Sequence, residues 1–315
     1  MEIIVVDDAS TDATPAVAAE TGVKVIQAPC NGGPGMARNL GAAVAKGDIL
    51  LFVDSDVVIG PGALQRVLET FRRQTSIAAL FGSYDNKPAA KGLVSTFRNL
   101  LHHFTHQTGD TDAATFWAGL GAVKRRVFLE IGGFDAKRFY RPSIEDIELG
   151  YRLKQAGHSI LLDPQLQAKH LKQWTLRSMV MTDVFCRALP WTRLILDSGK
   201  TETGLNLKFG QRISGALTLL AVLLLPFSWI EPNLLWAVAL SILTVVANNV
   251  RLYSLFRRTE GLAFAAACVP LHFLYLLYST LSYLYVRIFH AFRKSQSTVA
   301  PRRMGPDEFN EDRGT

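Results

Sequence analysis

The sequence predicts an α/β domain with a mostly parallel sheet, followed by helices that cross a membrane. Near the N-terminus, short β-branched apolar runs of the kind found in buried parallel strands occupy residues 3–6, 23–26 and 49–53. Helix-length segments, 14–20 and 36–45, separate these runs, so right-handed crossovers are expected between parallel strands. Beyond Arg212 the chain contains long stretches without any charged residue, which is typical of membrane segments.

Composition limits the classes of function. The 315 residues are 49% hydrophobic and 19% charged, which favours a folded chain over a disordered one. The formal net charge is +7, and its basic residues gather beside the apolar segments. Lipid headgroups explain that placement better than nucleic acid does, so no nucleic-acid partner is expected. Cys30, Cys186 and Cys268 lie far apart, which argues against a disulfide framework or a thiolate zinc site.

Four segments follow from the distribution of charge and hydrophobicity. They are an α/β domain at 1–163, a basic amphipathic segment at 164–212, two or three membrane spans at 213–290, and a disordered tail at 291–315. The second segment carries eight Lys and Arg against three Asp and Glu, interleaved with apolar residues. This pattern fits a helix in the lipid headgroup layer, and it also fits an amphipathic helix packed on the domain.

Three uncharged stretches are long enough to cross the ~30 Å hydrocarbon layer. They are residues 213–230, 233–250 and 261–286. Arg212 precedes the first and Arg251 follows the second, so the positive-inside rule predicts an in–out–in hairpin. No signal-peptide pattern follows Met1, so we expect a multi-pass protein of the inner membrane with its N-terminal domain in the cytoplasm. Arg287 follows the third stretch, which either crosses against the rule or re-enters near Pro270.

Acidic residues follow two of the predicted strands. Asp7 and Asp8 come directly after the first, and Asp54 and Asp56 directly after the third. Ligands of parallel sheets bind beyond the carboxyl ends of the strands, so these acids are expected in one crevice. Their mutual repulsion is normally offset by a cation or a ligand, and Mg²⁺ and Mn²⁺ prefer such oxygen donors together with substrate phosphates. Helix capping is the alternative for Asp7 and Asp8.

Five motifs in this order resemble the family 2 glycosyltransferases with the GT-A fold. The motifs occupy residues 5–12, 31–39, 47–56, 132–135 and 145–153, and the resemblance covers roughly residues 2–163. It implies inverting transfer of a sugar from a nucleotide-diphosphate sugar, by direct displacement, with Mg²⁺ or Mn²⁺ as cofactor. Because the uncharged stretches predict membrane spans, we expect the acceptor to lie close to the membrane, as a lipid-linked molecule or another glycan.

The resemblance also implies roles for residues on the donor side of the site. Asp7 or Asp8 would bind the donor base, Arg38 and Asn39 would lie near the phosphates and ribose, and Asp54 would contact the ribose or the metal. A divalent cation is needed because the diphosphate leaving group develops negative charge as its bond breaks. An ion pair with a structural Asp is the alternative for Arg38.

On the acceptor side, the resemblance implies that Asp146, with Glu145 beside it at the substrate, is the general base. A hydroxyl is a poor nucleophile, and a carboxylate within hydrogen-bond reach assists its attack. Asp56 would coordinate the metal, and His170 stands where some relatives have a metal-binding histidine. Trp117 would stack on a sugar. The alternatives are exposed first-turn acids favoured by the helix dipole, a surface histidine, and core packing of the tryptophan.

The sequence departs from the family at its start. Relatives have a further strand before the one at residues 3–6, and that strand forms part of the base pocket. A non-catalytic, membrane-anchored scaffold is therefore the alternative function. The Gln-x-x-Arg-Trp motif of processive synthases does not match around Trp174, which favours single transfers. For His102, His103 and His106 in a predicted helix, a solvated face is favoured over a metal site.

Overall fold

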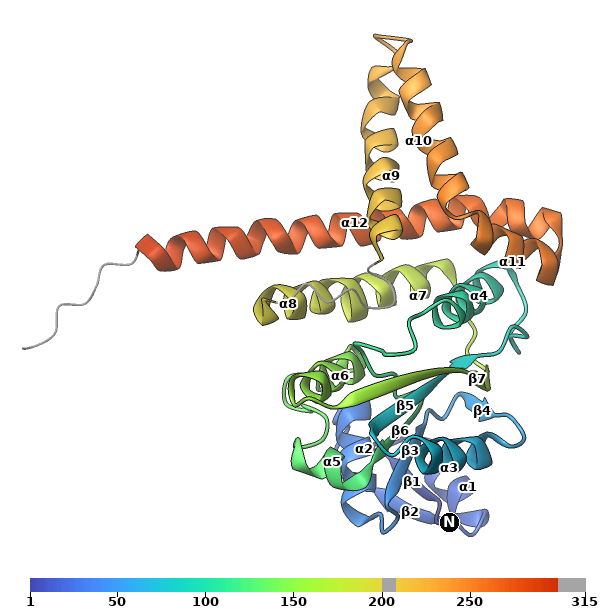
Figure 1. Cartoon of the computed structure of the whole chain (residues 1–315), viewed down its shortest axis with the longest axis vertical. Helices are drawn as coiled ribbons and strands as arrows, with labels where there is room; N and C mark the ends of the chain where they lie inside the picture. Colours follow the sequence, from blue (N-terminus) through green and yellow to red (C-terminus); the bar gives the residue numbers. More distant parts are fainter. Residues whose placement is uncertain (200–207, 300–315) are drawn as a thin grey trace, which may run out of the picture.

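The computed structural model describes residues 1–199 and 208–299 of the chain. Figure 1 shows an α/β domain, in blue to green, beneath a layer of helices in yellow to red. Within the domain, β1 (Ile4–Asp7) and β2 (Lys24–Gln27) form a parallel pair joined by α1 (Thr14–Glu20). These elements match the first strands and helix expected from the sequence.

A second sheet has five strands in the order β3-β6-β5-β7-β4. Their bounds are Ile49–Val53 for β3, Leu120–Lys124 for β6, Ile77–Tyr84 for β5, Ser159–His170 for β7 and Val57–Ile59 for β4. The strand β6 is antiparallel to both β3 and β5, whereas β7 is parallel to β5 and antiparallel to β4. Three of the five strands, β3, β5 and β7, therefore run in one direction, with β6 and β4 opposed.

Helices pack on both faces of this sheet. The domain helices are α2 (Gly33–Val44), α3 (Ala63–Arg73), α4 (Leu93–Gln107), α5 (Arg125–Glu130) and α6 (Glu145–Gln155). Side chains of a strand alternate between faces, and on β5 Phe81 joins a core cluster with Phe128 of α5 and Leu149 of α6. Its neighbour Leu80 joins the opposite cluster with Val67 of α3. Every residue of β5 is buried, as expected for a central strand.

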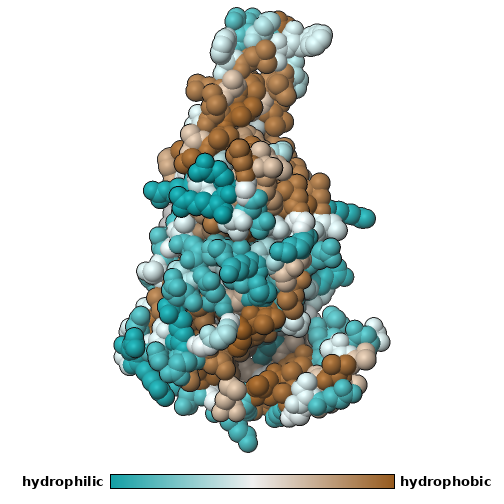
Figure 2. Space-filling model, turned by 90° about the vertical axis from the view of Figure 1, so that its right-hand side faces the viewer, coloured by the Kyte–Doolittle hydropathy of each residue, from teal (hydrophilic) through white to brown (hydrophobic). Residues whose placement is uncertain are grey.

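The upper part consists of helices. A continuous helical run contains α7 (Leu176–Met181), the π-helical segment η1 (Thr182–Ala188) and α8 (Leu189–Ser198). A hairpin of α9 (Phe209–Phe227) and α10 (Leu234–Asn248) follows, then α11 (Val250–Glu260) and α12 (Leu262–Val299). Two helices, at Phe209–Phe227 and Leu262–Phe292, are long and apolar enough to cross a membrane. The pair α10–α11, bent by 64°, is a third candidate. Figure 2 shows a mostly hydrophobic surface over the hairpin.

Two predicted boundaries were wrong. The α/β domain extends past residue 163, because β7 continues to His170 and pairs there with Val57 of β4. Pro164 does not end this strand because it lies in an irregularity, where the pairing shifts from Phe81–Leu162 to Ser83–Gln167. The helix α12 continues to Val299, since residues 291–299 contain no Gly or Pro, so this part of the expected tail is helical. Residues 300–315 lie outside the described part.

Candidate active site

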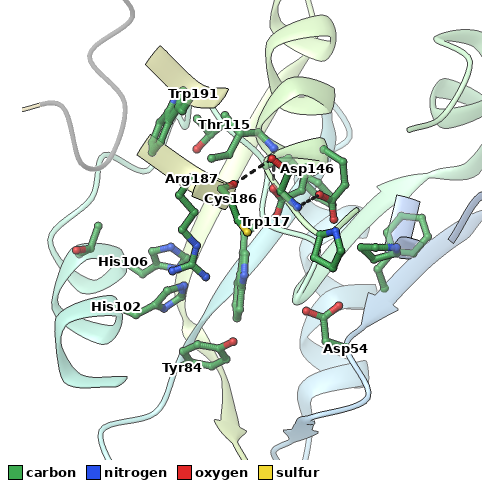
Figure 3. A pocket seen from close by; sticks show the side chains of 18 of the residues that line it. Asp54, Tyr84, His102, His106, Thr115, Trp117, Asp146, Cys186, Arg187 and Trp191 are labelled. Atoms are coloured by element: carbon green, nitrogen blue, oxygen red, sulfur yellow. Dashed lines mark hydrogen bonds between the residues drawn. The ribbon is translucent and has the colours of Figure 1, made fainter. Parts of the chain in front are cut away.

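A cavity of about 2250 Å³ extends from the ends of β1 and β3 to the helices above the domain. Its lining includes most of the predicted site residues: Asp8, Arg38, Asp54, Asp56, Trp117, Glu145, Asp146 and His170. Two predicted residues, Asp7 and Asn39, do not line it. Figure 3 shows Asp54, Trp117 and Asp146 around one open space, with side chains of the helical run on its other side.

Arg38 joins acids from two distant parts of the sequence. From α2, its guanidinium donates to Asp54 Oδ1 at 2.6 Å and to Glu145 Oε1 at 2.9 Å. Its side chain is only 15% exposed, so water screens these ion pairs weakly. The other oxygen of Glu145 accepts the backbone N–H of Ser143 at 3.0 Å. Arg38 thus has the structural ion pair considered from the sequence, and this pair lies in the cavity wall.

Asp146 is the second residue of α6. Its Oδ2 accepts the N–H of Ala118 at 3.1 Å, and its Oδ1 accepts the N–H of Ile147 at 2.8 Å. Burial and, next in size, the neighbouring charge of Glu145 raise the pKa of Asp146 to about 7 against the opposing effect of Arg38. A carboxyl group with a pKa near neutral has the proton affinity that suits a general base at physiological pH.

Asp56 and His170 meet at the end of β7. Their Oδ2 and Nε2 atoms are 3.5 Å apart, and the histidine ring stacks on Tyr84 with 4.2 Å between centroids. The hydrogen bond from His170 lowers the pKa of Asp56. Among residues 1–199 and 208–299, no cluster of three metal-ligating side chains occurs. One carboxylate and one imidazole nevertheless fit Mg²⁺ or Mn²⁺ when substrate phosphates complete the coordination, so the pair is compatible with such an ion.

Backbone N–H groups already occupy the carboxylates of the two acids expected to bind the donor base. Both oxygens of Asp8 accept N–H groups at the start of α2, from Gly32 and Gly33, each at 2.8 Å. Asp7 is 5% exposed and accepts the N–H of Ser10. Asp8 thus caps α2, whereas Asp7 closes a turn in the loop before α1, and neither caps the helix that directly follows them.

Asn39 lies outside the cavity for a structural reason. Its amide donates to the carbonyl of Phe134 at 2.8 Å and accepts the N–H of the same residue at 2.9 Å. It therefore holds the Gly-Gly-Phe-Asp turn against α2. Asp8 still borders the cavity, whereas the side chain of Asn39 is directed to this turn.

Trp117 stands in a cluster of rings. Its ring centroid lies 4.8 Å from those of Tyr84 and His102 and 5.3 Å from that of His106. The expectation of a solvated histidine face was wrong, because α4 packs against β5 and directs these histidines inward. His103 and His106 are buried, and their Nδ1 atoms contact the carbonyls of Tyr84 and Gly82.

Sequence reasoning missed several residues of the cavity. Tyr84 ends the central strand, Thr115 precedes Trp117, and Cys186 and Arg187 project from η1 toward Trp117 and the histidines (Figure 3). The basic amphipathic pattern of 164–212 predicted a helix here, but which face would border the site required the fold. The open edges of β1 and β3 also border the cavity, and within the described chain each of these strands has a single strand partner.

The domain has an α/β fold, and the acidic part of its cavity lies beyond the ends of β1 and β3. Folds of this class bind their ligands at that place. Residues 1–132 match the model of the family "Glycosyl transferase family 2". The match and the α/β architecture together confirm the predicted fold class.

Similar curated proteins include a pre-mycofactocin glycosyltransferase of Mycobacterium tuberculosis, 27% identical over 196 residues, which are 59% of this chain and 40% of the relative. The succinoglycan biosynthesis protein ExoO of Rhizobium meliloti is 43% identical over 72 residues, 22% of this chain and 21% of the relative. An uncharacterized glycosyltransferase of Haemophilus influenzae is 29% identical over 169 residues, 49% and 52% of the two chains. The chain thus spans between a fifth and about half of these relatives.

Solved structures give a weaker likeness. The mannosyltransferase PcManGT from Pyrobaculum calidifontis, in complex with GDP-Man and Mn²⁺, is 16% identical with a TM-score of 0.49, covering 90% of this chain and 78% of the other. A structure of GalNAc-T7 with UDP, GalNAc and Mn²⁺ is 18% identical with a TM-score of 0.43, covering 58% and 41%.

Proposed function

We propose that this protein transfers a sugar, with inversion, from a nucleotide-diphosphate sugar to a hydroxyl of a membrane-proximal acceptor, lipid-linked or another glycan. The observation that carries the proposal is one cavity shared by Asp146, the Arg38 ion pairs and the Asp56–His170 pair, which continues to the apolar helices. The match of residues 1–132 to the model of a glycosyltransferase family supports it.

In this mechanism Asp146 removes the proton from the acceptor hydroxyl. The hydroxyl oxygen attacks the anomeric carbon from the face opposite the diphosphate, and the bond to the diphosphate breaks as the new glycosidic bond forms. A single displacement inverts the configuration at that carbon. Arg38 holds Asp54 and Glu145 in place by its two ion pairs, with Asp54 at the ribose and Glu145 beside the reacting hydroxyl. Asp8 borders the donor side, and Trp117 offers its ring to a sugar.

Asp56 and His170 are the residues that would hold Mg²⁺ or Mn²⁺, whose role when bound is to stabilise the negative charge of the departing diphosphate. The low pKa of Asp56 keeps its carboxylate charged at neutral pH. We further propose that the protein resides in the inner membrane with the α/β domain in the cytoplasm, where nucleotide sugars are available. The candidate spans and the flanking cations support this placement.

Two variants of the full chain test the proposal. Asp146→Asn should lower turnover of the donor by about 10²- to 10⁴-fold while leaving nucleotide affinity intact, because only the base is lost. Asp56→Ala should weaken the Mn²⁺-dependent binding of a nucleoside diphosphate. Asp110→Asn, an exposed carboxylate outside the cavity, is the control. Wild-type turnover in both variants would contradict the assigned roles.

Calorimetry distinguishes a non-catalytic scaffold from a glycosyltransferase. Titration of the wild-type chain with UDP, GDP, CDP and ADP in the presence of Mn²⁺ should detect binding of at least one nucleotide. The observation that favours a scaffold is that backbone groups occupy the carboxylates of Asp7 and Asp8. Absence of binding for the whole panel would support the scaffold and exclude transfer.

A further inference from the structure

We propose that α12 lies in the plane of the membrane, in the headgroup layer next to the α/β domain, and that only the α9–α10 hairpin crosses the bilayer. The partner of its outer face is a lipid surface with anionic headgroups. Length and composition alone rank α12 as a candidate span. Its contacts lead to a different placement, and the inference is independent of the reaction catalysed.

The helix α12 contacts the domain side of the molecule along most of its length. Near its start, Ala265 and Cys268 are buried in a cluster with Phe97 and Leu100 of α4. In its middle, the hydroxyl of Tyr278 donates to Asp183 of η1 at 2.6 Å. These contacts show that α12 lies against α4 of the domain near its start and against η1 of the helical layer in its middle.

A third contact lies farther along the same helix. His290 Nε2 is 3.9 Å from Asp197 Oδ1 of α8. From residue 265 to residue 290 an α-helix rises by roughly 37 Å, which exceeds the ~30 Å hydrocarbon thickness. A spanning helix would leave the domain within that length. Because α12 keeps contact with α4, η1 and α8 instead, it runs along the helical layer on top of the domain, and Figure 1 shows it running crosswise to the hairpin.

The contact between α9 and α12 also indicates that α12 does not cross the bilayer. A Cβ added at Gly215, in the second turn of α9, would collide with Thr280 Oγ1, so the two helices are in close contact there. Thr280 lies near the middle of the apolar stretch Leu262–Phe292. If α12 crossed the bilayer, the charged start of α9, with Lys208 and Arg212, would lie near the bilayer centre. Lys208 instead donates to the carbonyl of Thr108 in the α/β domain.

The outer face of α12 suits a lipid surface. Exposed aliphatic and aromatic side chains cover most of its C-terminal half: Leu281, Tyr283, Leu284, Tyr285, Ile288, Phe289 and Phe292. Such a surface suits burial about 5–10 Å into the boundary between headgroups and acyl chains. Tyr278, which donates to Asp183 of η1, and Ser282 are buried.

An in-plane α12 also removes the conflict with the positive-inside rule. Arg251, Arg257 and Arg258 of α11 and Arg287 of α12 then lie on the same side of the membrane as Arg212. Their charges are placed to meet anionic headgroups. A crossing α12 would separate Arg287 from this group.

Topology is the first measurement. A reporter fused after Thr315 of the full chain should lie on the same side of a bacterial inner membrane as one fused before Met1. An impermeant maleimide should label Asn233→Cys, in the hairpin turn, from the opposite side, with the three native cysteines replaced by serine. A C-terminal reporter on the side of Asn233 would overturn the proposal.

Depth distinguishes an in-plane helix from a re-entrant one. Spin labels at Ala266→Cys, Leu281→Cys and Ile288→Cys, in vesicles of phosphatidylethanolamine and phosphatidylglycerol, should all report a shallow position below the phosphates. A label at Leu240→Cys on the exposed face of α10 serves as the deep reference. Each variant is accepted only if it remains monodisperse in detergent. A label on α12 that lies as deep in the bilayer as the label at Leu240 would contradict the in-plane placement.

Discussion

Glu145 and Asp146 are adjacent acids whose environments differ. Glu145 is 5% exposed and paired with Arg38, whereas Asp146 accepts backbone N–H groups and has a pKa raised to about 7. The pair thus divides into a charged, fixed carboxylate and one that can exchange a proton near neutral pH. A buried carboxyl group whose pKa is raised to near neutral, as that of Asp146 is, is typical of the acids and bases of active sites.

The first prediction concerns the pH dependence of turnover. If Asp146 is the base, kcat/KM should fall about tenfold per pH unit below 7 and level off above it, because only the deprotonated carboxylate accepts a proton. Initial rates of donor turnover from pH 5 to 9, at constant Mn²⁺, measure this profile. An acidic limb centred near pH 4 would show that an unperturbed carboxylate controls the rate.

The second prediction concerns stability. The folded chain holds the Asp146 proton more tightly than the unfolded chain, whose pKa is near 3.8, so ionising this group costs stability as pH rises from about 4 to 7. Each pKa unit corresponds to about 1.4 kcal/mol, which makes the cost above pH 7 of the order of a few kcal/mol. Asp146→Asn should therefore unfold at a higher temperature than wild type at pH 8.

Thermal unfolding followed by tryptophan fluorescence in detergent tests this effect. The difference between Asp146→Asn and wild type should shrink as the pH is lowered toward 4, where both side chains are uncharged. A variant that is less stable than wild type at pH 8 would show that the hydrogen bonds to Ala118 and Ile147 matter more than the buried charge.

At the scale of elements, one buried carboxylate connects three helices. Asp183 of η1 accepts hydrogen bonds from Arg98 of α4 at 2.7 Å, from Tyr278 of α12 at 2.6 Å and from Arg187 at 3.1 Å. The side chains of Arg98 and Asp183 are 12% and 5% exposed. Their ion pair therefore holds the helical layer to the domain beside the cavity.

The third prediction follows from this connection. Asp183→Asn keeps the shape of the side chain but leaves Arg98 buried without its counter-charge, which should cost about 3–5 kcal/mol. Asp197→Asn is the matched control, since the ion pair of Asp197 with Arg138 is half exposed and should contribute less than about 1 kcal/mol. Unfolding midpoints of the two variants measure the difference, and equal losses would contradict the role of Asp183.

At the scale of the whole molecule, the cavity connects the acidic crevice with the membrane helices. Tyr275, Ser279 and Thr280 of α12 line the same space as Asp54 and Asp146. An acceptor held by the membrane could therefore reach the base without leaving the lipid surface. The layer α7–η1–α8 lies between α12 and the α/β domain (Figure 1) and contributes Cys186 and Arg187 to the cavity.

The fourth prediction tests that route. Ser279→Trp should fill the membrane end of the cavity and lower transfer of labelled sugar into the lipid-extractable fraction of host membranes at least about tenfold. Release of free sugar into water should stay near wild type, because the donor side is unchanged. Leu281→Trp, on the exposed face of α12, is the control. Equal loss of both activities in Ser279→Trp would indicate a general defect instead of a blocked route.

Much of the fold could be predicted because its signals are local. Apolar β-branched runs predicted β1, β2 and β3 within a residue or two, and the uncharged stretches predicted the α9–α10 hairpin. The acids after β1 and β3 were expected in one crevice, and Asp8, Asp54 and Asp56 all border the cavity. Asn39 was misjudged, because its partner Phe134 is distant in sequence.

The order of residues along the chain was enough to predict the α/β class, the family resemblance and the membrane-like C-terminal half, because periodicity and charge need no distant partner. It was not enough to show that Arg38 pairs with Asp54 and Glu145, that the histidines of α4 face inward, or that α12 follows the domain surface. Those properties depend on neighbours that come together only when the chain folds. The same type of residue, an aspartate or a histidine, therefore takes a different role according to how deeply the fold buries it and which charge it pairs with.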